Sequence, residues 1–417
     1  MTASDAHRTI EAIWRIESPK LIAGLARMAG DVGVAEELAQ DAVVAALVQW
    51  PQAGIPRNPG AWLMAIAKRR AIDRFRRDDA LGRKRELMLR DIELAGEDAF
   101  EATDNEIGDD LLRLIFVACH PVLSMDARVV LTLRLLGGLT TAEIARAFLA
   151  AEPTIAQRIV RAKRTLSEAH VPFEVPGPAD RAGRLASVLE VVYLIFNEGY
   201  SATAGDDLMR PALCVDALRL GRVLAELAAD EPEVHGLVAL MEIQASRSNA
   251  RVDASGDPIL LLEQDRGKWD HLLIERGLAA LERAESHGGV LGPYALQAAI
   301  AACHARARTV AETDWARIAA LYDALAESLP NPVVQLNRAV AIGMAYGPEA
   351  GLDIANALTA EPALKSYHLL PSVRGDLLEK LGRFSEAQRA FEQAAALTKN
   401  ARDRALLLKR AATCARA

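Results

Sequence analysis

The chain has few aromatic residues and no long apolar run, and each shortage excludes a class of protein. Aromatic residues make up 5% of the 417 residues, whereas Ala, Leu and Arg recur throughout. That mixture favours helices over sheets. No run of about 18 uncharged apolar residues exists, so no membrane span is expected. The start, MTASDAHRTIEAIW, has neither a basic leader nor an apolar core of signal-peptide length. We therefore expect an all-α cytoplasmic protein.

Cysteine is also scarce, and the signatures of catalysis are missing. The four cysteines lie about a hundred residues apart, without metal-ligand spacing (Cys119, Cys214, Cys303, Cys414). This spacing predicts reduced, structural thiols. The sequence has no glycine-rich phosphate loop, nucleophile elbow or zinc-hydrolase motif. We predict no catalytic residue, no cofactor and no metal site.

The net charge of −7 argues against a nucleic-acid binder, but the charges are segregated along the chain. Between Pro56 and Arg90 there are eleven Lys and Arg against four acids. The following stretch, 91–110, is acidic and has no Lys or Arg. Because a local basic face decides DNA binding more than total charge does, the first hundred residues remain a candidate.

The length predicts two to four domains, and composition suggests their limits. We expect a helical domain at 1–90, an acidic linker at 91–107 and a second helical domain at 108–170. A Pro-rich linker at 171–180, VPFEVPGPAD, marks a strong boundary. Beyond it we expect a helical extension domain at 181–325 and helical repeats at 326–417.

Residues 137–166 carry the signature of a helix-turn-helix. Thr140 and Glu143 have the S/T-x-x-E spacing of a capping box, which starts a helix after Gly137–Gly138. Pro153 is expected at the first position of the next helix. In that helix one apolar stripe is predicted to be buried (Ile155, Ile159, Ala162, Leu166).

The opposite side of the second helix is polar and basic. Such a helix can lie in the major groove, with Gln157 suited to adenine and Arg158 to guanine. The DNA-binding set predicted for this helix is Thr154, Gln157, Arg158, Arg161, Lys163 and Arg164. An amphipathic surface helix with solvated arginines is the alternative.

A second informative stretch lies upstream. VAEELAQDAVVAALVQWP (34–51) precedes PRNPGAWLMAIAKRRAIDRFRRD (56–78), whose helical wheel is apolar on much of its circumference and basic on the rest. Ala61, Met64, Ala65, Ile72 and Phe75 are predicted to share one side.

Taken in this order, the two stretches resemble sigma-70-type RNA polymerase sigma factors of the extracytoplasmic-function (ECF) group. The motif A-E-E-L-A-Q-D-A followed by P-x-x-W-L-x-x-I-A-x-x-x-A-I-D-x-x-R-R is similar to region two. The later L-T-x-x-E-I-A…R-x-x-R-A-K-x-x-L is similar to region four. The acidic linker also suits the group, which lacks region three. The resemblance implies binding to core RNA polymerase and to promoter DNA.

Carried onto this chain, the resemblance implies a role for each matching residue. The β′ coiled coil of polymerase would meet Glu37, Leu38, Gln40 and Asp41, and the β flap would be a further partner. The 153–166 helix would read the −35 element. The loop 51–59 would capture a flipped base of the −10 strand. Phosphates and bases around −10 would meet Arg57, Asn58, Trp62, Lys68, Arg69, Arg70, Arg74, Arg76 and Arg77, although Trp62 is better explained as core.

The remainder resembles the ECF subgroup that carries a helical, tetratricopeptide-like extension, thought to replace a separate anti-sigma protein. KLGRFSEAQRAFEQAAAL (380–397) is similar to half a tetratricopeptide unit, with Leu381 and Gly382 at the turn, Ala387 at the helix approach and Phe391 in the groove. Polar residues are dense between 197 and 271 and suggest either a ligand-sensing cleft or, more simply, a buried ion-pair network (Asn197, Glu198, Arg247, Arg251, Asp253, Glu263, Asp265, Arg266, Asp270, His271).

The leading hypothesis is therefore a promoter-specificity subunit with a C-terminal regulatory or interaction module, whose partner is a protein or a small molecule. Two alternatives stay open. One is a free-standing helix-turn-helix regulator with a ligand- or protein-binding helical domain, which would not need the region-two motif. The other is an enzyme within 181–330, which no motif supports.

Overall fold

A computed structural model describes residues 3–77, 104–201, 208–253 and 256–416. These ranges hold eighteen α-helices and five short 3-10 helices and no strand, with a single isolated bridge between Val252 and Pro258. The all-α prediction is confirmed. By its internal contacts the chain divides into two units, Met1–Leu194 and Ile195–Ala417.

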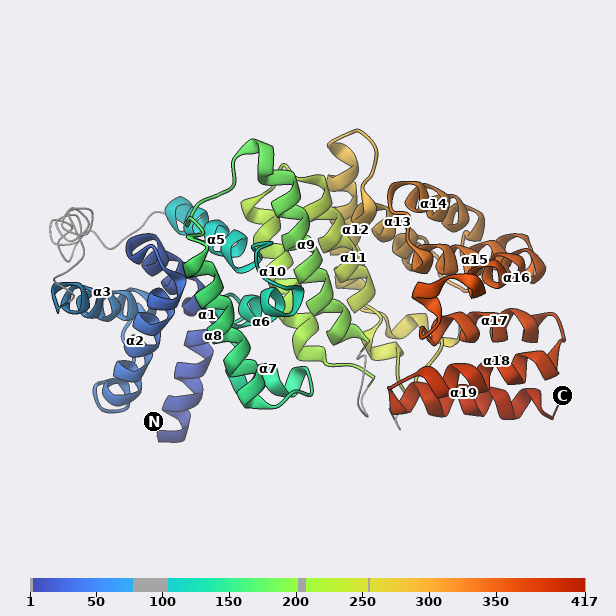
Figure 1. Cartoon of the computed structure of the whole chain (residues 1–417), viewed down its shortest axis with the longest axis horizontal. Helices are drawn as coiled ribbons and strands as arrows, with labels where there is room; N and C mark the ends of the chain where they lie inside the picture. The colour runs from blue at the N-terminus through green and yellow to red at the C-terminus, as the bar shows by residue number, and fades with distance from the viewer. Residues whose placement is uncertain (1–2, 78–103, 202–207, 254–255, 417) are drawn as a thin grey trace. The chain divides into compact units, whose positions relative to one another are not determined.

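Three helices form the first module of the first unit: α1 (Ala3–Ala29), α2 (Val32–Ala53) and α3 (Pro59–Arg77) (Figure 1). Asp31 caps α2 by accepting a hydrogen bond from the Val34 amide at 3.0 Å. Asn58 does the same for α3, where its Oδ1 accepts from the Ala61 amide at 3.0 Å. The caps supply acceptors for amides that a helix start leaves unpaired.

The core of the first module is aliphatic apart from one indole. Its fully buried side chains come from all three helices (Ile22, Leu25, Leu38, Trp50, Leu63, Ala67, Ala71). On α3 the buried stripe is Leu63, Ala67 and Ala71, whereas Ala65 is exposed. Of the apolar residues predicted to share one side, Ala65 is therefore not in the core, because packing against α1 and α2 decides which part of the apolar circumference is buried.

The second module of the first unit contains α5 (Asp104–Ala118), α6 (Met125–Leu135), α7 (Thr141–Ala147) and α8 (Glu152–Glu168). The capping box predicted at α7 is present: the Glu143 amide donates to Thr140 Oγ1 at 3.2 Å, and the Thr140 amide donates to Glu143 Oε2 at 2.8 Å. Pro153 is the second residue of α8, one position later than predicted. At either position its missing N–H costs no helical hydrogen bond.

Helix α9 (Pro178–Tyr200) begins within the Pro-rich segment, and its first part packs on the second module. Arg184 donates to the Phe116 carbonyl at 2.8 Å, and Ser187 donates to the Cys119 carbonyl at 2.7 Å. The division between the two units falls inside this helix, after Leu194.

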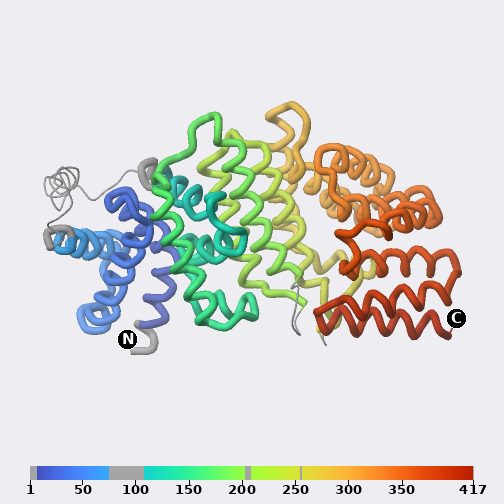
Figure 2. Tube along the Cα trace, viewed as in Figure 1, coloured from blue at the N-terminus to red at the C-terminus, as the bar shows by residue number. Residues whose placement is uncertain are grey.

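The second unit is a succession of helices in which sequence neighbours pack together (Figures 1 and 2). They are α10 (Pro211–Leu227), α11 (Pro232–Ala245), α12 (His271–Ser286), α13 (Pro293–Arg306), α14 (Trp315–Ser328), α15 (Pro332–Tyr346), α16 (Pro348–Ala357), α17 (Leu369–Lys380), α18 (Phe384–Leu397) and α19 (Ala401–Cys414). Contacts that run mainly between neighbours are typical of a solenoid.

The hairpin α17–α18 has the geometry predicted from its repeat motif. Gly382 ends α17 with φ of +71°, a conformation that side chains disfavour. Ala387 and Phe391 are fully buried, and a Cβ placed on Gly375 would lie 2.6 Å from the Phe391 ring. Small residues therefore allow these two helices their close approach.

Candidate functional site

Helix α8 presents two chemically distinct faces. The four residues of the predicted apolar stripe are at most 6% exposed, so the stripe is confirmed as core. Thr154, Gln157, Arg161 and Arg164 are exposed, and Arg158 and Lys163 are half-buried. One face thus anchors the helix while the other displays the donors expected to meet DNA.

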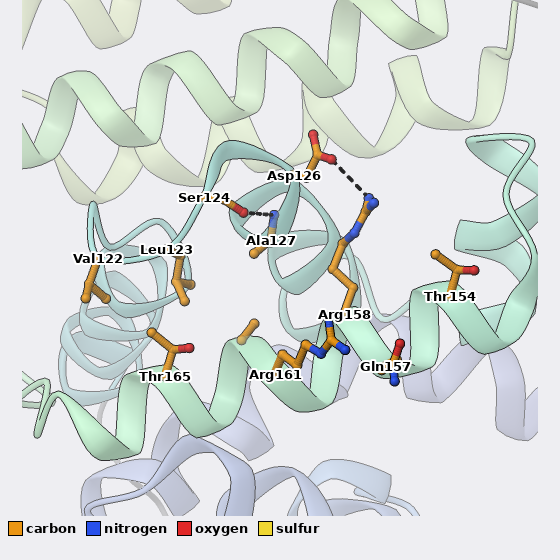
Figure 3. A pocket seen from close by; sticks show the side chains of 11 residues that line it. Val122, Leu123, Ser124, Asp126, Ala127, Thr154, Gln157, Arg158, Arg161 and Thr165 are labelled. Atoms are coloured by element: carbon orange, nitrogen blue, oxygen red, sulfur yellow. Dashed lines mark hydrogen bonds and ion pairs between the residues drawn. The ribbon is translucent and has the colours of Figure 1, made fainter.

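A groove of about 390 Å³ lies along the exposed face of α8, between it and the start of α6. Figure 3 shows Gln157, Arg158 and Arg161 on one wall and Ser124 and Asp126 on the other. Arg158 pairs with Asp126 across it at 3.3 Å. Arg158 is therefore held by an acid of its own module, within the set of side chains that would read bases.

Acids of the chain also pair with two further cations of α8. Arg164 pairs with Glu168 one turn later, at 3.4 Å, with both side chains well exposed. Lys163 pairs with Glu36 of the first module. The exposed Arg164–Glu168 pair contributes little to stability and can give way to a phosphate, whereas the Lys163–Glu36 pair is largely buried.

Helices α2 and α3 form an edge on which acids and arginines alternate. Glu37 meets Arg74 at 2.7 Å and Asp41 meets Arg70 at 3.2 Å. The carboxylates are 62% and 53% exposed, so a partner can reach them. Leu38 is 2% exposed, and therefore packs beneath this face rather than on it.

The residues predicted for the −10 element have different surroundings. Arg57 and Arg69 are exposed, while Asn58 is occupied as the cap of α3. Trp62 is half-buried, and its ring lies edge-on to that of Trp50 at 5.2 Å between centroids. Burial, followed by repulsion from Arg27, lowers the pKa of Lys68. The side chains of Arg76 and Arg77 lie outside the described residues.

Glu36 is the residue that sequence reasoning missed. Only 2% of it is exposed, yet its carboxylate meets two cations of the second module, Arg134 at 2.6 Å and Lys163. Burial raises the pKa of Glu36, but the attraction of Lys163 and Arg134 outweighs it, and the pKa is lowered overall. The carboxylate is therefore ionised. Its partners lie about a hundred residues away, so no local motif could reveal them.

The polar residues between 197 and 271 mainly hold loops of the second unit in place. Arg266 donates to the carbonyl oxygens of His304 at 2.8 Å and Ala307 at 2.6 Å. Arg251 lies 3.7 Å from the centre of the Tyr200 ring. Asp265 caps the 3-10 helix Arg266–Lys268, and Asp270 caps α12. These contacts favour a structural role over a ligand-sensing cleft. The predicted network consisted of ion pairs, whereas Arg266 and Arg251 contact carbonyl oxygens and an aromatic ring.

Acid–base and metal chemistry find little support in the described ranges. There, no group of three or more His, Cys, Asp or Glu could hold a metal ion. All four cysteines are free and buried, and burial raises the pKa of the Cys119 thiol to about 11. Burial, with Arg247 and Arg266 nearby, lowers the pKa of His304 to about 4. Among the helices described, none has the length and apolar character needed to cross a bilayer.

Comparison with known families matches three segments. Residues 14–80 match sigma-70 region 2, and residues 113–166 match sigma-70 region 4. Residues 184–285 match a family of unknown function, DUF6596. The first two matches cover the first and second modules, and the third covers the start of the extension.

Individual proteins of other bacteria are similar to most of this chain. An uncharacterised protein of Rhizobium meliloti (R00370) is 42% identical over 93% of this chain and 92% of its own length. Probable ECF RNA polymerase sigma factors named SigI, from two Mycobacterium tuberculosis strains, are 26% identical over 68% of this chain and 99% of their own length. No solved structure matches.

The class that the two modules define is the sigma-70 type of transcription initiation factor, which is not an enzyme class. Within it, this chain belongs to the ECF-type factors that carry a C-terminal helical extension of the DUF6596 kind. Its function is promoter recognition together with core RNA polymerase. The free-standing regulator is not favoured, because such a protein would not need region two.

Proposed function

We propose that each described face has one partner in the initiation complex. The acids Glu37 and Asp41, with Gln40 beside them, bind the β′ coiled coil, and the second module binds the β flap. Helix α8 reads the −35 element through Gln157, Arg158 and Arg161. Helix α3 and the segment 51–59 hold the −10 strand in the cytoplasm, where polymerase works; residues 51–53 of this segment end α2, so the loop predicted at 51–59 is shorter and spans 54–58.

The observation that carries this proposal is the split character of α8. Its apolar side is completely buried, so its orientation is fixed, and its other side displays an amide and guanidinium groups of the kind that bind base edges in pairs. On α3, arginines project beside acids that a partner can displace. The work of such a protein is binding: melting becomes favourable when an unpaired base gains a pocket and its strand gains cationic contacts.

Reconstitution tests the proposal directly. Purified chain is added to core RNA polymerase, and the complex is assayed by pull-down and by run-off transcription from promoters selected with the holoenzyme. We expect stable association and transcription that depends on both promoter elements. Sequence-specific promoter binding by the chain without core, combined with failure to associate with core, would contradict it.

We further propose that the extension regulates the fraction of chain that is competent to bind core. Its helices pack mainly on their sequence neighbours, and stacked helices of this kind create extended surfaces that can bind a protein or small-molecule partner. Removal of residues 195–417 is expected to change the chain concentration that gives half-maximal run-off transcription. An unchanged concentration would contradict a regulatory role.

A further inference from the structure

Helix α5 ends with carbonyl groups that its own turns cannot pair, and α9 supplies donors for two of them. The last carbonyls of any helix lack an intrahelical partner. At the end of α5, the Phe116 carbonyl accepts a hydrogen bond from Arg184 Nη2 at 2.8 Å, and the Cys119 carbonyl accepts one from Ser187 Oγ at 2.7 Å. Both donors lie on α9, one turn apart. Helix α9 therefore caps a helix of the second module.

The same contact continues into the loop 119–124, which joins α5 to α6. Ser187 Oγ also accepts a hydrogen bond from Arg128 Nη1 at 2.9 Å. The Arg128 guanidinium in turn donates from Nε to the Leu123 carbonyl at 2.9 Å and from Nη2 to the Pro121 carbonyl at 3.4 Å. Ser187 is only 7% exposed, so water has little access to replace these partners. Through one serine, α9 is thus connected to three carbonyls of the loop.

The loop 119–124 is also part of one wall of the groove along α8. Val122, Leu123 and Ser124 line this groove together with residues of α8 (Figure 3). A recognition helix in the major groove lies between two phosphate backbones, and contacts with those backbones fix its register and orientation. The wall beside α8 therefore decides how closely a duplex can approach the base-reading side chains.

The two partners of this contact belong to different families. The match to sigma-70 region 4 covers residues 113–166, and the match to DUF6596 begins at residue 184. Arg184 is therefore the first residue of the matched extension, and Ser187 is the fourth. The extension supplies the donors, whereas region four supplies the carbonyls that they bind.

We propose that Arg184 and Ser187 are positioning residues for −35 recognition: they hold the loop 119–124, and so one wall of the groove, in the conformation that admits duplex DNA. The extension in this way takes part in promoter recognition through α9, without touching a base. When either donor is lost, a carbonyl at the end of α5 loses its partner, so the loop opens more often. A smaller fraction of the chain can then form the base contacts. The inference rests on the proposed function, because it requires α8 to read the −35 element.

Hydrogen exchange and DNA titration test the two steps of this inference. In Ser187→Ala, amide hydrogen exchange over residues 119–124 of the full chain should be about tenfold faster, because a buried hydrogen bond is lost. Holoenzyme assembled from the full chain and core polymerase is titrated with a duplex that carries only the selected −35 element, and with the same duplex after scrambling of that element. The preference for the selected duplex should fall by about the same factor. Affinity for core, and for a single strand with the −10 element, should stay unchanged.

The second unit offers a matched control for this variant. Ser246 is 1% exposed, and its hydroxyl donates to the Ile243 carbonyl at 2.7 Å, the same distance as between Ser187 and its carbonyl. Ser246→Ala therefore removes a comparable buried hydrogen bond, and should leave both the loop exchange and the −35 preference unchanged.

A pair of variants at Arg184 separates positioning from simple stability. Arg184 is half-buried, so its replacement threatens the fold less than that of Ser187. Arg184→Met keeps an apolar stem but removes the donors, and should lower the −35 preference as Ser187→Ala does. Arg184→Lys keeps a cation at the end of α5, where the helix dipole favours one, and should recover most of the preference. A purely structural role would lower the unfolding temperature of the variants and leave the preference of the folded holoenzyme unchanged.

The outcomes distinguish this inference from the proposed function. A wild-type holoenzyme that binds the selected and scrambled duplexes equally well contradicts the proposed function, and the positioning role falls with it. When the wild type does discriminate, an unchanged −35 preference in Ser187→Ala and Arg184→Met overturns the positioning role alone, whatever happens to the unfolding temperature. Loop exchange that stays slow in both variants overturns it as well, because the loop would then be held by other contacts.

Discussion

The guanidinium of Arg158 has two competing partners: the Asp126 carboxylate of its own module and the DNA base that it is expected to bind. This guanidinium pairs with Asp126 at 3.3 Å on the wall of the groove, where the two side chains are 36% and 71% exposed. A bidentate contact to guanine would replace one acceptor with two aligned ones. The pair with Asp126 thus positions the Arg158 side chain, but a base can replace Asp126 as its partner.

Replacement of this side chain tests the base contact. Arg158→Ala should weaken binding of the holoenzyme to its −35 element by about 1–3 kcal/mol, because a bidentate guanine contact is lost. Binding titrations with the selected element and with single-base variants measure the change. Equal weakening on every sequence would instead assign Arg158 to a phosphate, and unchanged affinity would remove it from the interface.

At the other end of the first unit, Glu37 and Asp41 combine exposure with pairing to Arg74 and Arg70. Pairs this exposed contribute roughly 0–1 kcal/mol to stability. Their loss should therefore affect a partner far more than the fold.

Charge reversal at these acids should separate binding from folding. Glu37→Lys/Asp41→Lys is expected to abolish association with core polymerase, because a basic surface would replace an acidic one and repel the same partner. Pull-down with core measures association, and thermal unfolding followed by circular dichroism checks the fold. Glu11→Lys, on an exposed part of α1, is the control. Retained affinity for core would place the interface elsewhere.

Among the helices, α7 depends most clearly on one capping residue. Thr140 and Glu143 satisfy each other's backbone amides, and Arg15 adds a pair to the Glu143 carboxylate. Burial raises the pKa of Glu143, but the hydrogen bonds from Thr140 and the charge of Arg15 lower it further. The capping box therefore contributes stability above the unfolded pKa of 4.5, and this contribution is lost as pH falls through the lower folded pKa.

Removal of the cap should cost more at neutral pH than in acid, because the Glu143 carboxylate titrates whereas the hydrogen bond from the Glu143 amide to Thr140 Oγ1 does not. Thr140→Ala should lower the free energy of opening α7 by about 1 kcal/mol at pH 7, with a smaller effect once the pH falls below the lowered pKa of Glu143. Amide hydrogen exchange across residues 141–148 measures the opening. Thr141→Ala, one position beyond the cap, is the control. A loss that is the same at both pH values would show that the carboxylate takes no part.

Sequence patterns predicted correctly those features that depend only on residues close together in the chain. The capping box at Thr140 and the buried stripe of α8 follow from neighbours within a few residues, and both are present. On α3 the apolar pattern did not single out Leu63 and Ala67, because only packing against α1 and α2 decides which part of an apolar circumference is buried. Glu36 was passed over as one acid among several, since its burial comes from α6 and α8.

For the molecule as a whole, ion pairs between its own acids and its DNA-facing cations predict weak DNA binding by the free chain. The net charge is −7, and five of the cations expected to meet DNA pair with an acid of the same chain: Arg70 with Asp41, Arg74 with Glu37, Arg158 with Asp126, Lys163 with Glu36 and Arg164 with Glu168. Phosphates must displace these carboxylates. The free chain should therefore bind duplex DNA weakly until polymerase holds the modules in place.

Neutralising two of these acids should reveal the hidden charge. Asp126→Asn/Glu168→Gln leaves Arg158 and Arg164 without their carboxylates, so core-independent binding to duplex DNA should strengthen at low salt. Because each newly available cation adds one released counterion, the slope of log affinity against log salt should steepen by about two. Asp323→Asn/Glu386→Gln changes the net charge equally, but removes the partners of Arg338 and Arg383 in the second unit. Equal slopes for the two double variants would show that total charge, rather than pairing on α8, controls DNA binding.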